Sequence, residues 1–132
     1  MLTRGGLGDE WLLATAAVCG HPAEGIESLG LGWDGSCESD RAHVSTTIAR
    51  LRRRAPLLVL TDLHGSTPTN LAAEQAVDPD VVVIAGANLA MVLRLACEDR
   101  AQRSLDELSR WICDKGRSAI RRIEPSETES EP

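Results

Sequence analysis

The sequence contains neither phenylalanine nor tyrosine, and three tryptophans are its only large aromatic side chains. Leucine, isoleucine, valine and alanine must therefore form the core. No apolar run approaches the roughly 18 residues that a membrane span needs, so we expect no membrane insertion. The start of the chain also lacks an apolar signal segment, and we expect the protein to be cytoplasmic.

Lysine is nearly absent, since Lys115 is the only lysine among the 14 basic residues. The formal net charge is −6, which argues against a nucleic-acid-binding protein because such proteins usually carry a basic face. The acidity is partly local, because residues 124–132 contain four glutamates and no basic residue. We interpret 124–132 as a disordered acidic tail and 1–123 as the folded domain.

Metal-ligand spacings are missing as well. The four cysteines include no C-x-x-C pair, and the three histidines form no local ligand cluster, so we expect neither a metal nor a cofactor. Cys19, Cys97 and Cys113 lie on the apolar stripes of predicted helices. We interpret all three as small buried hydrophobic residues in a reducing compartment.

The chain alternates between helical periodicity and short apolar runs. Because it has 132 residues, one domain is expected. Strands are predicted at 1–3, 26–31, 57–60 and 81–84, and helices at 9–19, 40–54, 68–77, 88–100 and 104–116. This alternation predicts an α/β fold with an open, mostly parallel sheet and helices on both faces.

Both ends of the predicted domain are unusual. A first strand of three residues is short for a parallel sheet, so either this strand is stunted or the natural start lies upstream of Met1. At the other end, Gly116 is predicted to end the last helix, and 118–123 is predicted as a final short strand.

Candidate site residues follow the predicted strands, because ligands of open α/β sheets bind beyond the carboxyl ends of the strands. Asp62 follows a buried strand; it either caps the next loop, or it orients a neighbouring catalytic group or binds a cation. Arg4 could meet it if their strands are neighbours. His64 is either a site residue or a surface histidine, whereas His21 and His43 are interpreted as surface residues.

Three segments carry a family resemblance: LTRGGLGDEWLLA at 2–14, LTDLHGSTPTNLA at 60–72 and VIAGANLAMVLRL at 83–95. They resemble, in order and spacing, the "THGxLAxxLL", "DLxGGTPxN" and "xxGxNLPML" segments of one family. This is the enzyme IIA component of the mannose/fructose family of the phosphoenolpyruvate-dependent sugar phosphotransferase system. The resemblance covers the chain apart from its tail.

The resemblance implies a cytoplasmic homodimer in which a C-terminal strand, here 118–123, crosses to the partner subunit. It also implies that the protein HPr phosphorylates a histidine after the first strand and that enzyme IIB accepts the phosphoryl group. The aspartate that orients this histidine corresponds to Asp62. The matching segments place Gly5, His64, Ser66 and Thr67 among the expected binding residues.

The sequence departs from the family at the nucleophile, because the histidine of the T-H-G segment is replaced by Arg4. A guanidinium stays protonated, so it can bind an anion but cannot attack phosphorus. We therefore expect Arg4 to form an ion pair with Asp62 in the former acceptor site. His64, where the family has a bulky residue, and Ala90, where it often has proline, are further departures.

Three functions remain open, and so does the question of whether the protein is an enzyme. The first is a IIA homologue that is impaired in phosphotransfer or acts as a regulator. The second is an active phosphocarrier that uses His64. The third is a receiver-like switch phosphorylated on Asp62, although Lys115 is its only lysine and no acidic pair follows the first strand.

Overall fold

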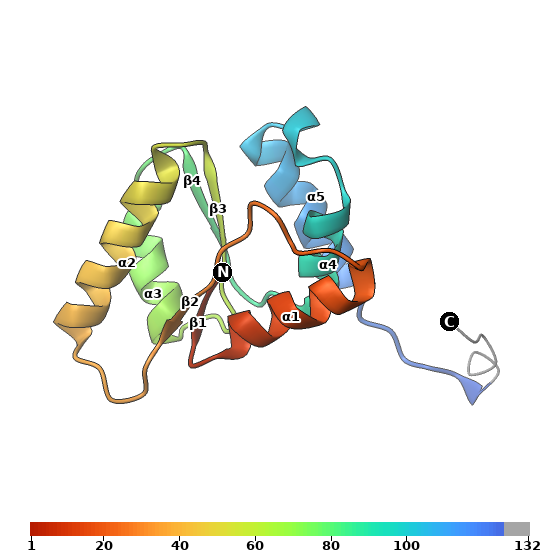
Figure 1. Cartoon of the computed structure of the whole chain (residues 1–132), viewed down its shortest axis with the longest axis horizontal. Helices are drawn as coiled ribbons and strands as arrows, with labels where there is room; N and C mark the ends of the chain where they lie inside the picture. Colours follow the sequence, from red (N-terminus) through yellow and green to blue (C-terminus); the bar gives the residue numbers. More distant parts are fainter. Residues whose placement is uncertain (126–132) are drawn as a thin grey trace.

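Four short parallel strands lie at the centre of the computed structural model, which describes residues 1–125. Helices follow each strand along the chain (Figure 1). The elements are β1 (Leu2–Arg4), α1 (Leu7–Cys19), β2 (Leu29–Leu31), α2 (Cys37–Arg52), β3 (Leu57–Leu60), α3 (Thr67–Gln75), β4 (Val81–Ile84), α4 (Leu89–Cys97), the short 3₁₀ helix η1 (Arg100–Gln102) and α5 (Leu105–Ser118).

The strands are arranged in the order β2-β1-β3-β4. β1 pairs in parallel with β2, β3 pairs in parallel with β4, and a single parallel bridge between Leu2 and Thr61 joins the two pairs. From β1 the chain therefore continues toward one outer strand of the sheet, and from β3 it continues toward the other outer strand. Ligands of open α/β sheets bind at such a switch point, at the carboxyl ends of the strands.

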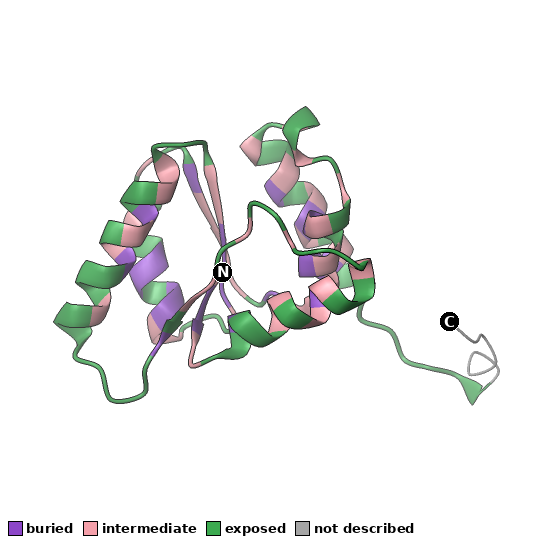
Figure 2. Cartoon of the chain, viewed as in Figure 1, coloured by how far each residue is buried: buried purple, intermediate pink, exposed green. Residues whose placement is uncertain are grey.

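Helices cover both faces of the sheet, as predicted. Figure 1 shows α2 and α3 on one face and α1, α4 and α5 on the other. Each layer encloses its own hydrophobic cluster, and Figure 2 shows buried residues concentrated where helices meet strands. Val44, Ile48 and Leu71 lie in the cluster under α2 and α3, whereas Val92 and Ile112 lie in the other cluster. Burial of these aliphatic side chains is the main stabilising contribution.

β2 is shorter than predicted, because it begins at Leu29 rather than at residue 26. The reason is the length of its partner. Leu29 donates its amide to the carbonyl of Met1, where the paired part of the chain starts, so residues before Leu29 have no strand to bond. The limited length of β1 thus also sets the length of β2.

Residues 118–123, predicted as a final strand that crosses to a partner subunit, form no strand within the described chain. Ser118 is the last residue of α5, and the residues that follow pair with no described strand. Ile120 and Ile123 are exposed, and Figure 1 shows this segment leaving the body of the molecule. A strand needs a neighbouring backbone to bond with, and this segment lies beside no strand of its own chain. Most of the predicted acidic tail, residues 126–132, lies outside the described residues.

The prediction that Gly116 ends the last helix is wrong, because α5 continues to Ser118. Gly116 is buried, and a Cβ added there would lie 2.5 Å from the sulfur of Met91. The amide of Asn88 also donates to the Gly116 carbonyl at 3.1 Å. Gly116 therefore allows close packing of α5 on α4 rather than a change of direction.

The cysteines are less buried than predicted. Cys97 is exposed, and Cys19 and Cys113 are half-buried. Cys19 and Cys97 are the last residues of α1 and α4, where the apolar face of each helix reaches solvent. All four cysteines are free thiols. Within residues 1–125, none of the helices has both the length and the apolar character needed to cross a membrane.

Candidate functional site

The candidate site lies at the carboxyl ends of β1 and β3, the neighbouring strands at the switch point. Leu2 pairs with Thr61, so Arg4 and Asp62 both follow this pairing at the same edge of the sheet. The loops after β1, β3 and β4 meet at this edge, which we call the carboxyl edge. The three motif segments identified in the sequence all contribute to it.

Arg4 is directed toward the loop after β2 rather than toward Asp62. Its Nη1 donates to the carbonyl of Gly32 at 2.7 Å and lies 3.9 Å from Oδ2 of Asp40, in the first turn of α2. Its guanidinium also lies 5.6 Å from the centre of the Trp33 ring, within the range of a cation–π interaction. The expected ion pair between Arg4 and Asp62 is therefore wrong.

The ion pair with Asp40 is well shielded from water. The Arg4 and Asp40 side chains are 21% and 13% exposed, respectively. Sequence reasoning missed Asp40, Trp33 and Gly32 as neighbours of Arg4. The available signal was that α2, like the other helices, begins at the carboxyl ends of the strands, so its first acidic residues lie at the same edge. The separation of 36 positions between Arg4 and Asp40 hid the contact.

Asp62 is left with an unused acceptor. Its Oδ1 is buried and accepts no hydrogen bond from the described residues. The interpretation that Asp62 caps the next loop is thus not supported, since neither the hydrogen bonds nor the ion pairs of the described chain include its carboxylate. A buried carboxylate oxygen is costly without a donor. Asp62 is therefore positioned to accept a hydrogen bond from a group that enters the site.

A hydroxyl network holds the loop after β3 in place. Thr61 and Thr69 are buried, and their hydroxyl oxygens lie 2.7 Å apart. The Thr69 hydroxyl also donates to the carbonyl of Leu63 at 2.7 Å. Ser66 is the N-cap of α3, as its hydroxyl accepts the amide of Thr69. Residues 61–66 are consequently fixed to the first turn of α3, with Ser66 and Thr67 at the edge.

His64 lies on this loop but is not held. Its side chain is exposed and makes no hydrogen bond or ion pair with the described residues. Gly65, which follows it, has φ of 82°, a conformation that suits glycine. An exposed imidazole without an orienting carboxylate lacks the support that a phospho-accepting histidine needs.

The glycine loop after β1 packs against β2. The amide of Gly5 donates to the carbonyl of Leu31 at 2.7 Å, and the amide of Gly8 donates to the hydroxyl of Thr3 at 3.1 Å. A Cβ added at Gly30 would lie only 2.1 Å from the Gly5 carbonyl oxygen. These two amides are therefore already used inside the fold, which leaves fewer donors than a phosphate-binding glycine loop would offer. The described residues contain no cluster of three or more potential metal ligands.

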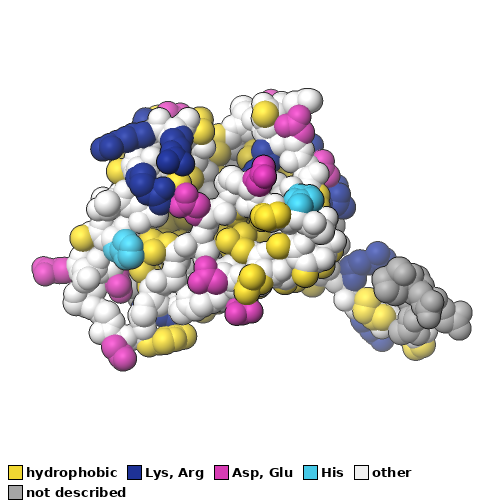
Figure 3. Space-filling view, in the orientation of Figure 1, with side chains coloured by type: hydrophobic (Ala, Val, Ile, Leu, Met, Phe, Trp, Pro, Cys, Tyr) yellow, Lys and Arg dark blue, Asp and Glu magenta, His cyan; other side chains and the backbone are white. Residues whose placement is uncertain are grey.

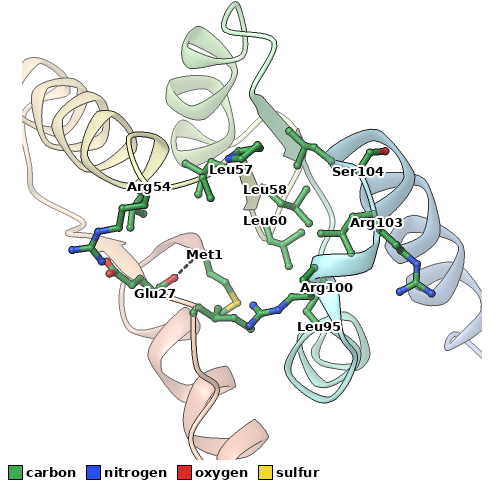
Figure 4. A pocket seen from close by; sticks show the side chains of 18 residues that line it. Met1, Glu27, Arg54, Leu57, Leu58, Leu60, Leu95, Arg100, Arg103 and Ser104 are labelled. Atoms are coloured by element: carbon green, nitrogen blue, oxygen red, sulfur yellow. Dashed lines mark hydrogen bonds between the residues drawn. The ribbon is translucent and has the colours of Figure 1, made fainter.

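A cavity with a volume of about 740 Å³ lies at the opposite, amino edge of the sheet. Leu57, Leu58 and Leu60 of β3 line one side, and residues of α4 and α5 line the other (Figure 4). In Figure 3, hydrophobic side chains are visible in the hollow between the two helical layers. β1 begins at Leu2, opposite Thr61, so most of β3 has no neighbouring strand on the side of this cavity.

The amino group of Met1 lies at the end of this cavity and donates to the carbonyl of Glu27 at 2.5 Å (Figure 4). Burial lowers the pKa of this amino group to about 6, and the nearby carboxylate of Glu27 opposes the shift only in part. The cavity is thus separate from the site around Arg4 and Asp62, which lies at the other end of the strands.

Comparisons with known proteins agree with this architecture. A sequence model of the family described as PTS system fructose IIA component matches residues 5–112. A mannose/sorbose-specific IIA subunit of the phosphotransferase system from Enterococcus faecalis is 27% identical, with a TM-score of 0.78, over 92% of this chain and 90% of that one. No curated protein matches the chain.

Two further solved structures share the fold. Phosphotransferase system component EIIA from Streptococcus agalactiae is 24% identical, with a TM-score of 0.77, and the match covers 95% of this chain and 94% of that one. A PTS IIA protein associated with the fucose utilization operon of Streptococcus pneumoniae is 18% identical, also with a TM-score of 0.77, over 97% and 92%.

Proposed function

The chain belongs to the family of fructose-type IIA components of the phosphotransferase system, and from this we propose that it binds phosphorylated partners of that system without carrying the phosphoryl group itself. By the resemblance to the "THGxLAxxLL" segment, Arg4 stands at the position of the family's phospho-accepting histidine. The proposed role is regulatory, and loss of phosphotransfer is its central feature.

The main support for this proposal is that Arg4 has a permanently charged guanidinium at the position of the nucleophile. A guanidinium has no free lone pair and keeps its proton, so it cannot attack phosphorus and pass a phosphoryl group onward. Its contacts with the Gly32 carbonyl and with Asp40 support a fixed binding role. A guanidinium carries five N–H donors, so donors remain for an anion after these contacts are made.

Asp62 supports the same proposal from the other side of the site. Its buried Oδ1 needs a donor, and a phosphorylated histidine of a partner would offer a ring N–H together with a phosphoryl group. We expect Asp62 to accept the N–H and Arg4 to bind the phosphoryl oxygens. The partner would then be recognised in its phosphorylated state and released unchanged.

A labelling experiment tests the loss of phosphotransfer. The protein is incubated with enzyme I, HPr and labelled phosphoenolpyruvate, and we expect no phosphohistidine on the wild-type chain. The Arg4→His variant restores the nucleophile next to Asp62, so we expect it to become labelled. The double variant Arg4→His with Asp62→Asn is the matched control and should lose most of this label. Stable labelling of a wild-type histidine would overturn the proposal.

The same experiment separates the alternatives. If His64 is the acceptor, the label maps to residues 55–76 and disappears in His64→Ala. If Asp62 acts as in a receiver, Mg²⁺-dependent labelling by acetyl phosphate appears on an aspartate. Neither alternative is favoured. The His64 side chain is exposed and has no orienting partner, and the described residues contain no acidic cluster that could bind a metal ion.

Binding is tested separately from labelling. We expect the protein to bind phosphorylated HPr at least tenfold more tightly than HPr itself in calorimetric titrations. Arg4→Met should abolish this preference, because methionine keeps the apolar stem and removes the charge. We also propose, from the family, that the protein acts in the cytoplasm as a homodimer and contacts enzyme IIB. Light scattering of the purified protein tests the dimer.

A further inference from the structure

Two cysteines that are far apart in the sequence meet at the ends of two neighbouring helices. The sulfur atoms of Cys19 and Cys97 lie 2.7 Å apart, although 78 positions separate the two residues in the chain. A disulfide bond has an S–S distance of about 2.05 Å, so bonding needs only a small approach. α1 and α4 pack side by side on the same face of the sheet, which holds the two thiols together.

The pair is accessible to reagents in solution. Cys97 is exposed and Cys19 is half-buried, so a small oxidant reaches Cys97 first. The hydrogen bond to Cys97 and partial burial raise the pKa of the Cys19 thiol. The other two cysteines lie on different helices: Cys37 is the first residue of α2, and Cys113 lies in α5.

We propose that Cys19 and Cys97 form a reversible disulfide that joins the C-terminal ends of α1 and α4. This inference does not depend on the proposed function, because it rests only on the position of the two thiols. The chemical class of the oxidant is a low-molecular-weight disulfide such as oxidised glutathione.

The reaction proceeds by two thiol–disulfide exchanges. The Cys97 thiol loses its proton to solvent, and its sulfur attacks one sulfur of oxidised glutathione, which releases one glutathione thiolate and leaves a mixed disulfide on Cys97. The Cys19 thiol then loses its proton, and its sulfur attacks Cys97 Sγ, which releases the second glutathione. The two protein thiols are oxidised, oxidised glutathione is reduced to two thiols, and excess glutathione reverses both steps.

The bond would act as a clamp within one layer of the fold. Both helices begin at the carboxyl edge: Gly5 and Gly6 separate β1 from α1, and α4 starts directly after Asn88. Figure 1 shows α1 running away from the strands, so its C-terminal end, which carries Cys19, lies apart from the carboxyl edge. Oxidation therefore fixes α1 against α4 without placing a new group near Arg4 or Asp62. A link across 78 positions also restricts the unfolded chain strongly.

The test uses the full chain in glutathione buffers that range from reducing to oxidising. Free thiols are blocked with N-ethylmaleimide in denaturant, and peptides are mapped by mass spectrometry. We expect two of the four cysteines to escape alkylation after oxidation, and a linked peptide pair that contains Cys19 and Cys97. Glutathione in excess should restore alkylation of all four.

Variants define which thiols are responsible. The double variant Cys37→Ser with Cys113→Ser keeps only the proposed pair, and its melting temperature should rise by about 10 °C on oxidation. Cys19→Ser should accumulate glutathione on Cys97 and show no such rise. The inference is overturned if oxidised wild-type protein links other cysteines, if it carries glutathione on Cys19 and Cys97 independently, or if the double variant gains no linked peptide.

Discussion

The carboxyl and amino edges of the same sheet differ in how completely they are built. At the carboxyl edge, side-chain caps, a threonine network and the Gly5–Leu31 hydrogen bond hold each loop in place. At the amino edge, β3 borders a cavity of about 740 Å³, and the Met1 amino group, whose pKa is lowered to about 6, lies beside it. The difference arises from one element, because β1 reaches only the carboxyl edge.

Because β1 is short, only the amino edge, which β1 does not reach, lacks strand pairing beside β3. β1 spans three residues and still has a neighbour on each side: it pairs with β2 along its length, and its first residue, Leu2, bridges to Thr61, just past the carboxyl end of β3. The site edge can therefore be complete while the opposite edge is hollow. Perturbations at the two edges should accordingly have different effects on stability.

The largest effect is expected at the contact between the loop after β1 and β2. In Gly30→Ala, the new Cβ would lie 2.1 Å from the carbonyl oxygen of Gly5, and this backbone is held by its bond to Leu31. We expect a loss of about 3 kcal/mol or more in the free energy of unfolding, measured by urea denaturation.

Gly6→Ala is the matched control, because a Cβ at Gly6 meets nothing within 4 Å. It should change stability by less than about 0.5 kcal/mol. Equal effects of the two substitutions would show that the carboxyl edge is not tightly built. If Gly30→Ala yields no folded protein, the loss of its circular dichroism signal next to a normal Gly6→Ala spectrum confirms the expectation.

The next effect concerns pH at the amino edge. The pKa of the Met1 amino group falls from 8.0 to about 6 on folding. Between these values the unfolded chain binds more protons, so stability rises with pH from about 6 to 8, by about 2.5 kcal/mol in total. Urea denaturation at several pH values measures this slope.

Acetylation of the Met1 amino group provides the control for this slope. The acetylated chain cannot be charged there, and its histidines are unchanged. The difference between the two forms therefore isolates the amino group. If both forms show the same pH dependence, the amino group is not buried as described.

A smaller effect is expected at the cap of α4. Asn88 accepts the amide of Met91 at 3.2 Å and donates to the carbonyl of Gly116 at 3.1 Å. Asn88→Ala removes both bonds and should cost about 1 to 2 kcal/mol in thermal or chemical denaturation. Asn88→Asp keeps the cap and loses the donor, so its cost should be intermediate. An Asp variant as unstable as the Ala variant would contradict the role of the cap.

The smallest effect is expected for a larger side chain next to the cavity. Leu58→Phe places extra volume beside the hollow at the amino edge, and we expect stability to change by less than about 0.5 kcal/mol in either direction. Leu71→Phe, at a position 3% exposed in the core, should cost about 2 kcal/mol. Similar costs for both would mean that the cavity closes in solution.

Much of the fold could be predicted from local patterns. The continuous apolar runs at β3 and β4 predicted buried parallel strands, and both were confirmed with the predicted bounds. Ser104 with Glu107 predicted a capping box, and Asn88 predicted a cap. These features succeed because each depends on residues close together in the chain.

Contacts between distant residues could not be predicted in the same way. The sequence suggested Asp62 as the partner of Arg4, since both follow neighbouring strands. The Arg4 side chain instead points toward Asp40 and pairs with it. The meeting of Cys19 and Cys97 likewise depends on how α1 and α4 pack. The predicted strand at 118–123 finds no partner within the chain for the same reason, because strand pairing is set by the neighbouring backbone rather than by the segment alone.

Gly116 has a practical consequence for any protein joined to this one. Because Gly116 has no side chain, α5 packs closely against Met91 of α4, and a larger residue at this position would displace the Met91 side chain or the helix. The polypeptide therefore departs from a defined point two residues later, at Ser118. A reporter attached there would start from a known position and heading, which makes this terminus suited to distance measurements by fluorescence or spin labels.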